Sequence, residues 1–427
     1  MISIGFMPNR IWLLMAIALY ALSRIYVIQS VDSTFPATGD AGHYYQIASN
    51  LAQQGVYAES GMEPTASAAW RAPLWPFVLS AWLELNPTYT MVLFMKLLFE
   101  LIPLVFLYMF LRMAAFEGIA LGVVLSLFAI EPQYLKYAST FLSENLTAWL
   151  LAATTASFML TVVSNSRIAT WCTAVFAGLS ALSHPVVFLY GFMLVVIAFV
   201  HRHRKGGHWL AYVSFATWIL IISAWPVRNA LVFGNGVWMT TSQGAVFSKS
   251  WNEAVVTSHT NTQGDLLDEG LNLKYLPELK SDALTDPIQM SALYGQATME
   301  FIKQTDAQTL LKIAFVKLYS GLNPVPQSNK PGMLELLGTA FRCFYLLGFL
   351  MAAWSLLKGS YEKLSLAWWA SWLIICSYVS MAIMSVVMYT GLRFNSPFGL
   401  SLVVLSSMVF CGRIIRVPGV TLNPSNG

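Results

Sequence analysis

Residues 38–82 read TGDAGHYYQIASNLAQQGVYAESGMEPTASAAWRAPLWPFVLSAW, and they lie between two apolar segments that are each long enough to cross a bilayer. The stretch is too polar to cross a membrane itself, yet it is rich in aromatic and small residues. It contains an acid (Asp40), a histidine (His43) and an arginine followed closely by two prolines (Arg71). Because most of the remaining chain is apolar, we expect any chemistry to begin here.

Composition sets the fold class. The chain has 427 residues, of which 57% are hydrophobic and 10% are charged, whereas soluble proteins carry about 25% charged residues. Repeated apolar runs of about 20 residues predict an all-α polytopic membrane protein with about ten spanning helices, within a range that extends to twelve. The net charge of +4 is not gathered into a basic domain, so we expect no nucleic-acid partner.

The apolar runs predict ten spans and two long loops. The spans are 10–29, 89–112, 118–131, 143–163, 168–183, 185–201, 208–226, 335–357, 365–389 and 396–413. They form a single domain over residues 1–415, followed by a cytoplasmic tail at 416–427. The long loops cover residues 30–88 and 228–333. Within the second, residues 285–319 have helical spacing, which predicts either amphipathic helices at the membrane surface or a small packed helical cap.

Basic residues in the short loops predict the orientation. If the N-terminus is cytoplasmic, nearly all of them fall on the inner side, while the short outer loops receive only Lys136 and Arg393. Most carboxylates then face outward. We therefore expect a multi-pass protein of the plasma (inner) membrane whose working surface is extracytoplasmic.

Asp40 is the first candidate for chemistry. It follows Gly39 and precedes a short predicted helix, 41–51, so it is either an ordinary N-cap or a general base. Burial at a membrane face is expected to raise the pKa of its carboxyl group toward the working pH. His43 lies one helical turn further on and either packs or holds a divalent metal together with Asp40. Tyr44 and Tyr45 are the neighbouring aromatic candidates.

Three arginines recur at the predicted outer face. Arg71 is in WRAPLWP, Arg228 is in AWPVRN beside Asn229, and Arg393 is in YTGLRFNSP. Each alone is explained by snorkelling, but three at one depth favour a shared anionic ligand.

Two charged candidates lie within or beside the predicted spans. Lys96 stands one turn from Glu100, and either the two neutralise each other or Lys96 reaches a lipid phosphate. Glu144 opens the fourth span, either as a first-turn acid favoured by the helix dipole or as a second carboxylate in a cavity.

Taken together, these pieces resemble the membrane glycosyltransferases of the C-type superfold (GT-C), in particular bacterial relatives of the protein mannosyltransferases and the lipid A aminoarabinose transferase. The matching pieces, in the family's order, are Asp40 with Y…A..L…G, Arg71-x-Pro-x-x-Pro, Ser143-Glu144, W-P-x-R-N (225–229) and Arg393-x-x-x-Pro. The sequence departs from the family at Asp40-Ala41, where many relatives have Asp-Glu, and at His184-Pro185, where many have Arg-Pro.

The resemblance implies an enzyme that uses a polyprenyl-phosphate sugar donor and transfers the sugar with inversion to a lipid, glycan or protein acceptor outside the cytoplasm. It implies Asp40 as the base. The donor phosphate would contact Arg71, Arg228, Arg393 and Lys96, and the cavity or acceptor side would hold His43, Tyr44, Tyr45, Glu144 and Asn229. No cofactor is specified, although a divalent metal fits the acid. The alternatives are a lipid or glycan transporter or flippase, and an O-antigen-type polymerase or ligase.

Overall fold

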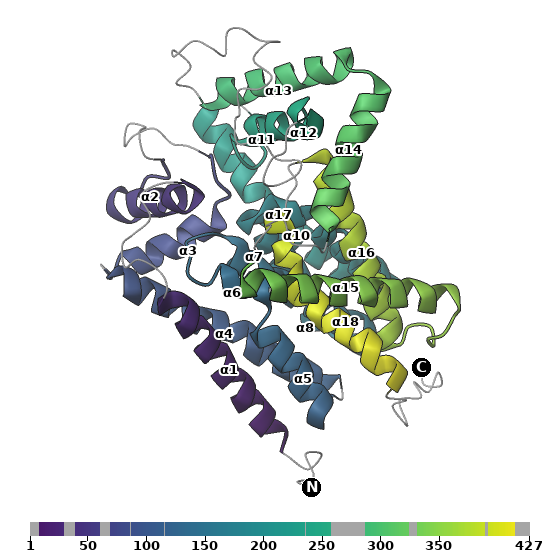
Figure 1. The fold of residues 1–427 in the computed structure, drawn as a ribbon. Helices are drawn as coiled ribbons and strands as arrows, with labels where there is room; N and C mark the ends of the chain where they lie inside the picture. Colours follow the sequence, from purple (N-terminus) through teal and green to yellow (C-terminus); the bar gives the residue numbers. More distant parts are fainter. Residues whose placement is uncertain are drawn as a thin grey trace.

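The computed structural model describes residues 8–29, 39–59, 69–85, 87–114, 116–234, 236–257, 287–323, 331–388 and 392–414. Within these ranges the regular structure is entirely helical (Figure 1). The predicted all-α polytopic class is therefore confirmed. The predicted tail, 416–427, lies outside the described residues.

Nine helical segments in the described part of the chain are long and apolar enough to cross a membrane. They are α1 (Asn9–Gln29), α4 (Tyr89–Met113), α5 (Gly118–Ala129) continued by α6 (Pro132–Lys136), α7 (Glu144–Ser164), η2 (Pro185–Val187) continued by α9 (Phe188–Arg204), α10 (His208–Phe233), α15 (Met333–Leu357), α16 (Leu366–Val387), and α17 (Leu392–Asn395) with η5 (Ser396–Phe398) and α18 (Gly399–Ile414). The predicted fifth span forms α8 (Arg167–Ser183), which has only 17 residues. That length is at the lower end of what crosses a bilayer.

Local sequence explains the tight connections around α8. Asn165 adopts a left-handed conformation with φ of 53° and ends α7. The Ser166 side chain then caps α8 by accepting a hydrogen bond from the Ala169 amide. At the other end, Pro185 opens η2 directly after His184. α7 and α8 pack closely as a hairpin.

The remaining helices lie outside the spanning set. They are α2 (Gly39–Gln54), α3 (Leu74–Leu83), α11 (Gln243–Ser250), α12 (Ala254–Thr257), α13 (Pro287–Gln304) and α14 (Ala307–Leu322). In Figure 1, α1 begins and α18 ends toward one end of the molecule, whereas α2, α11, α12 and α13 lie toward the other. The two helices predicted within 285–319 are α13 and α14; α13 packs on α11, and α14 packs on α16.

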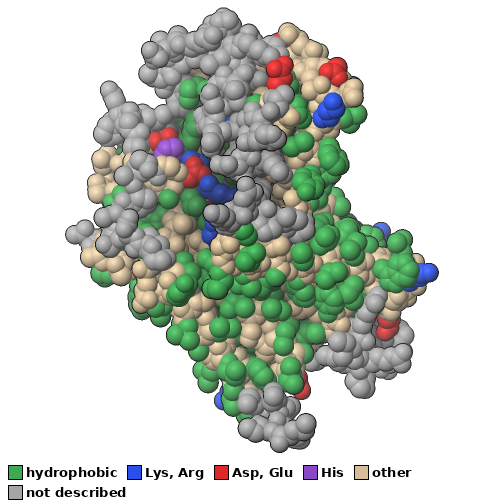
Figure 2. Space-filling view, viewed as in Figure 1, with side chains coloured by type: hydrophobic (Ala, Val, Ile, Leu, Met, Phe, Trp, Pro, Cys, Tyr) green, Lys and Arg blue, Asp and Glu red, His purple; other side chains and the backbone are tan. Residues whose placement is uncertain are grey.

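The spanning helices bury a continuous apolar core. Its largest cluster draws on α5, α7, α9, α16 and α18, and α18 is the most deeply buried span in the described part of the chain. A broad hydrophobic surface covers the lower part of the molecule in Figure 2, as expected for helices that face lipid.

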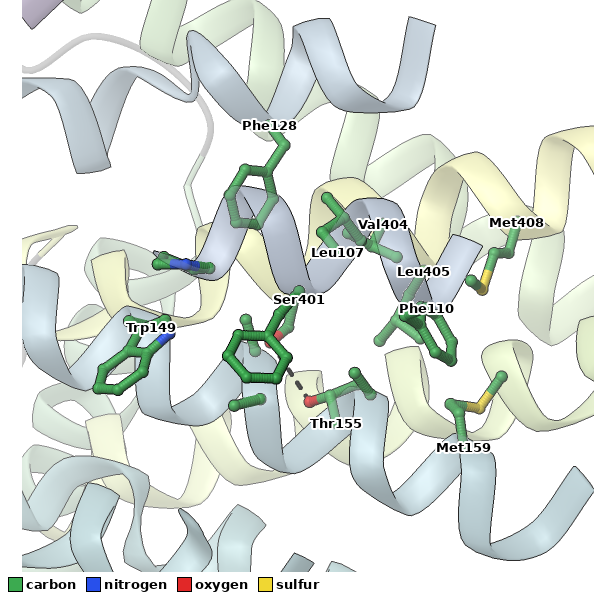
Figure 3. A pocket seen from close by; sticks show the side chains of 15 residues that line it. Leu107, Phe110, Phe128, Trp149, Thr155, Met159, Ser401, Val404, Leu405 and Met408 are labelled. Atoms are coloured by element: carbon green, nitrogen blue, oxygen red, sulfur yellow. Dashed lines mark hydrogen bonds between the residues drawn. The ribbon is translucent and has the colours of Figure 1, made fainter. Parts of the chain in front are cut away.

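A small cavity of about 40 Å³ lies inside this core between α4, α7 and α18 (Figure 3). Its lining is apolar apart from Thr155 and Ser401, whose hydroxyl groups lie 3.3 Å apart and pair with each other. No charged side chain lines it, so we interpret it as a packing space of the core.

Candidate active site

A larger, polar cavity of about 240 Å³ lies where several distant segments meet. Its walls come from the start of α2, residues 70–72, the turn between α8 and η2, residues 240–249, the end of α16, and α17. Acidic, basic and histidine side chains gather above the hydrophobic surface in Figure 2. The cavity is therefore the candidate active site.

Asp40 is at the centre of its charged groups. The carboxylate lies in the first turn of α2 and contacts an arginine through each oxygen. Its Oδ1 is paired with Nη2 of Arg71, and its Oδ2 accepts a hydrogen bond from Nη1 of Arg393 at 2.6 Å. The two arginines are 31 and 353 residues away in the sequence. The fold thus joins the beginning and the end of the chain at one carboxylate.

The predicted rise in the pKa of Asp40 is wrong. Burial of the carboxyl group acts to raise its pKa. The positive charges and hydrogen bonds of Arg71 and Arg393 together outweigh that effect and lower the pKa from 3.8 to about 2. The prediction from the sequence included the effect of burial on the pKa of Asp40 but not the effect of arginines beside it. Asp40 is consequently ionised at neutral pH, and in this arrangement it is a weak base.

Arg71 is held in place through its backbone segment. The Tyr57 hydroxyl donates to the Arg71 carbonyl at 2.9 Å, and the Ser242 hydroxyl donates to the Trp70 carbonyl at 3.0 Å. The Arg71 guanidinium also donates to Nδ1 of His43 at 2.9 Å. His43 therefore supports Arg71, one helical turn from Asp40.

Arg393 lies between two acids. Its Nε donates to Glu144, the first residue of α7, while its Nη1 donates to Asp40. The Glu144 side chain is only 2% exposed. The Asn395 amide donates to the Gly321 carbonyl at 2.6 Å, which anchors α17 against the end of α14. Glu144 is therefore both a first-turn acid and a second carboxylate beside the cavity.

The cavity is also lined by Tyr44, a predicted site residue, and by His184, which stands where many relatives have arginine. The Tyr44 hydroxyl pairs with the Ser143 hydroxyl at 3.0 Å, and the Arg71 guanidinium lies 5.6 Å from the Tyr44 ring centre. His184 caps η2 by accepting a hydrogen bond from the Val186 amide. Burial lowers the pKa of His184 to about 4, so at neutral pH its imidazole is uncharged and does not replace the arginine expected there from the family pattern.

Lys96 is not among the residues that line the polar cavity. Its ammonium group donates to the carbonyls of Tyr137 and Thr140, each at 2.6 Å, and lies 3.7 Å from Glu100. The side chain is 2% exposed. These contacts correct the alternative in which Lys96 reaches a lipid phosphate, because all its partners lie within the protein interior.

Arg228, Asn229 and Tyr45 are also placed away from the cavity lining. The Arg228 guanidinium lies over the rings of Trp225, Tyr57 and Phe233. The buried Asn229 side chain accepts from Arg228 and donates to the Val237 carbonyl. Tyr45 packs beside Phe141, with ring centres 6.2 Å apart. The expectation that three arginines share one ligand thus reduces to two arginines in the described structure.

Two residues not singled out from the sequence lie at the site. Lys249 of α11 lines the cavity, and Glu59 is close enough to Arg71 to interact with its charge. Burial raises the pKa of Glu59 to about 7, although Arg71 acts to lower it. Neither residue stands in a recognisable motif. Only the tertiary packing of their segments brings them near the cavity.

Metal ligation has little support from the geometry. Over the described ranges, no group of three or more His, Cys, Asp or Glu side chains is arranged to hold a metal ion. Asp40 and His43, the pair considered from the sequence, both contact Arg71. A guanidinium thus stands where the pair would otherwise share a cation.

No family model and no curated protein sequence matches the chain. A crystal structure of ArnT from Cupriavidus metallidurans in the apo state is similar, with 14% sequence identity and a TM-score of 0.38, over 94% of this chain and 78% of that one. At this level of similarity, any function has to be inferred from the side chains of the site itself.

Proposed function

We propose that the chain is a membrane glycosyltransferase that moves a sugar from a polyprenyl-phosphate donor to a hydroxyl acceptor, with inversion, on the extracytoplasmic side of the plasma (inner) membrane. The observation that supports this best is the convergence of Asp40, Arg71 and Arg393 on one cavity. A carboxylate suits removal of a proton, and two guanidinium groups suit a phosphate that must leave.

The cavity also has a wall that suits a lipid. Met384, Met388 and Phe394 contribute apolar surface next to the charged groups. A donor with a hydrocarbon chain and a charged head would meet both kinds of surface at once. A free nucleotide-linked sugar would leave this apolar wall without a partner.

The proposed reaction follows from these positions. The acceptor hydroxyl oxygen forms a bond to the anomeric carbon of the sugar, and Asp40 takes the hydroxyl proton. The bond between that carbon and the phosphate oxygen breaks, and its electron pair stays on the phosphate. Arg71 and Arg393 stabilise the charge that develops there.

The test is transfer from a purified polyprenyl-phosphate sugar, with membrane extract as the source of acceptors. We expect Asp40→Asn to remain folded and to keep donor binding, while transfer is lost because no base removes the proton. Near-normal turnover by this variant would exclude Asp40 as the base. Movement of the lipid-linked sugar across vesicles by the wild type, without any transfer product, would favour the transporter interpretation.

A further inference from the structure

The charges of the site neutralise one another in the structure. Both oxygens of Asp40 are taken by arginines, and Arg393 is shared between Asp40 and Glu144. An arriving anion therefore finds Arg71 and Arg393 already paired. The residue in the role of base is also the residue that occupies the anion-binding groups.

The two carboxylates differ in how firmly they are held. The Glu144 side chain is 2% exposed, whereas the Asp40 side chain is 34% exposed and faces the cavity. Glu144 uses the Nε edge of Arg393, and Asp40 uses Nη1. An anion can replace Asp40 on Arg393 without breaking the contact to Glu144.

From this geometry, and resting on the function proposed above, we infer that the phosphate of the donor displaces Asp40 from Arg71 and Arg393, so that the base is released only when the donor is bound. Glu144 keeps Arg393 in place during the exchange. The cavity, at about 240 Å³, has room for the carboxylate to turn aside. Donor binding and base activation become one event.

Release changes the chemistry of Asp40. The two arginines lower its pKa, and burial alone raises it. A carboxylate that has left the arginines, and that faces a phosphate, is a stronger base. An acceptor hydroxyl, or water, is consequently not deprotonated in a site that lacks donor.

The first test compares donor-site affinity in wild type and Asp40→Asn, both as full-length purified protein at pH 7. The probe is farnesyl methyl phosphate, a phosphodiester that has one negative charge throughout the pH range used. We expect the variant to bind about tenfold more tightly, because the probe no longer has to break two partly exposed ion pairs. Glu117→Gln is the matched control, since it removes a carboxylate that pairs with Arg112 outside the site, and its affinity should equal that of wild type.

The second test follows the pH dependence of probe binding in wild type and in Asp40→Asn. Displacement raises the pKa of Asp40, so probe binding takes up a proton, and wild-type affinity should increase as pH falls from 7 to 4.5. Other charged or titratable groups near Asp40 are Arg71, Arg393, Glu144, His43, His184, Lys249 and Glu59. These groups remain in Asp40→Asn, so the part of the pH dependence that disappears in this variant belongs to Asp40.

A structure of the complex with the probe gives the direct readout, with both Asp40 oxygens expected beyond about 4 Å from either guanidinium. Equal affinities, together with Asp40 still paired in the complex, would overturn the inference but leave the proposed function standing. If Arg393→Ala does not weaken probe binding, the phosphate site itself is absent and the proposed function fails as well.

Discussion

Arg393 has the most consequential set of contacts in the site. It pairs with a buried acid on one edge and a partly exposed acid on the other, and the short helix that presents it is anchored to the end of α14. Arg228 has the same charge, yet it stacks on aromatic rings. The two arginines therefore allow a phosphate-binding role to be separated from a packing role.

We expect Arg393→Ala to weaken phosphodiester binding by about 2 kcal/mol, as for the loss of a charge-assisted hydrogen bond. Arg228→Ala should leave the affinity unchanged and instead lower thermal stability, because the side chain covers apolar rings. Titration calorimetry and thermal unfolding of both variants check the pair. Equal losses of affinity would contradict the assignment.

Glu59 makes a pH-dependent contribution to the stability of the folded protein. Its pKa is raised from 4.5 to about 7 by burial, so the folded state binds a proton more tightly than the unfolded state. The resulting stability is fully present below about pH 4.5 and is lost as pH rises through 7. We expect Glu59→Gln to raise the melting temperature at pH 8 relative to wild type and to change it little at pH 4. The same shift at both pH values would refute this explanation.

Among the helices, α11 is the wall of the cavity that depends most on close packing. The Gly244 amide donates to the Ser291 hydroxyl at 2.9 Å. A Cβ at Gly244 would overlap the Ser291 carbonyl oxygen of α13. α11 and α13 therefore approach closely because residue 244 has no side chain.

We expect Gly244→Ala to destabilise the protein by about 1–3 kcal/mol, the usual cost of overpacking, and to weaken probe binding because Gln243, Ala245, Val246 and Lys249 would shift. Gly236→Ala is the control, since a Cβ there meets nothing within 4 Å. Thermal unfolding and probe affinity should separate the two variants. Similar behaviour of both would argue against a role for this contact.

For the molecule as a whole, the positions of the helices were predicted from the sequence better than the directions in which their side chains point. Apolar runs define where spans begin and end, which explains why all ten predicted segments are helical. The apolar run that forms α8 is 17 residues long, so whether α8 counts as a membrane-spanning helix depends on its length alone. The convergence of Asp40 with Arg71 and Arg393 was expected because loop position gives depth in the membrane.

The direction in which a side chain points around its helix was not predictable in the same way. Lys96 contacts backbone carbonyls and Arg228 contacts aromatic rings, and neither side chain lines the cavity. Lys249 reaches the cavity from α11, a short helix without a motif. These outcomes depend on which helices are neighbours, and that information is not present in the pattern of a single segment.

Asp40 and Arg393 are separated by 353 residues, and this distance bears on biosynthesis. A ribosome-bound chain that has inserted every helix up to α16 already has Asp40 and Arg71, but it has no partner for the Nε-facing oxygen of Glu144 and no second guanidinium. Under the proposed function, such a chain therefore has an incomplete phosphate-binding site. The site that we propose is complete only when the last helix has been inserted, so a chain that ends before Arg393 is expected to lack one of the two guanidinium groups that bind the donor phosphate.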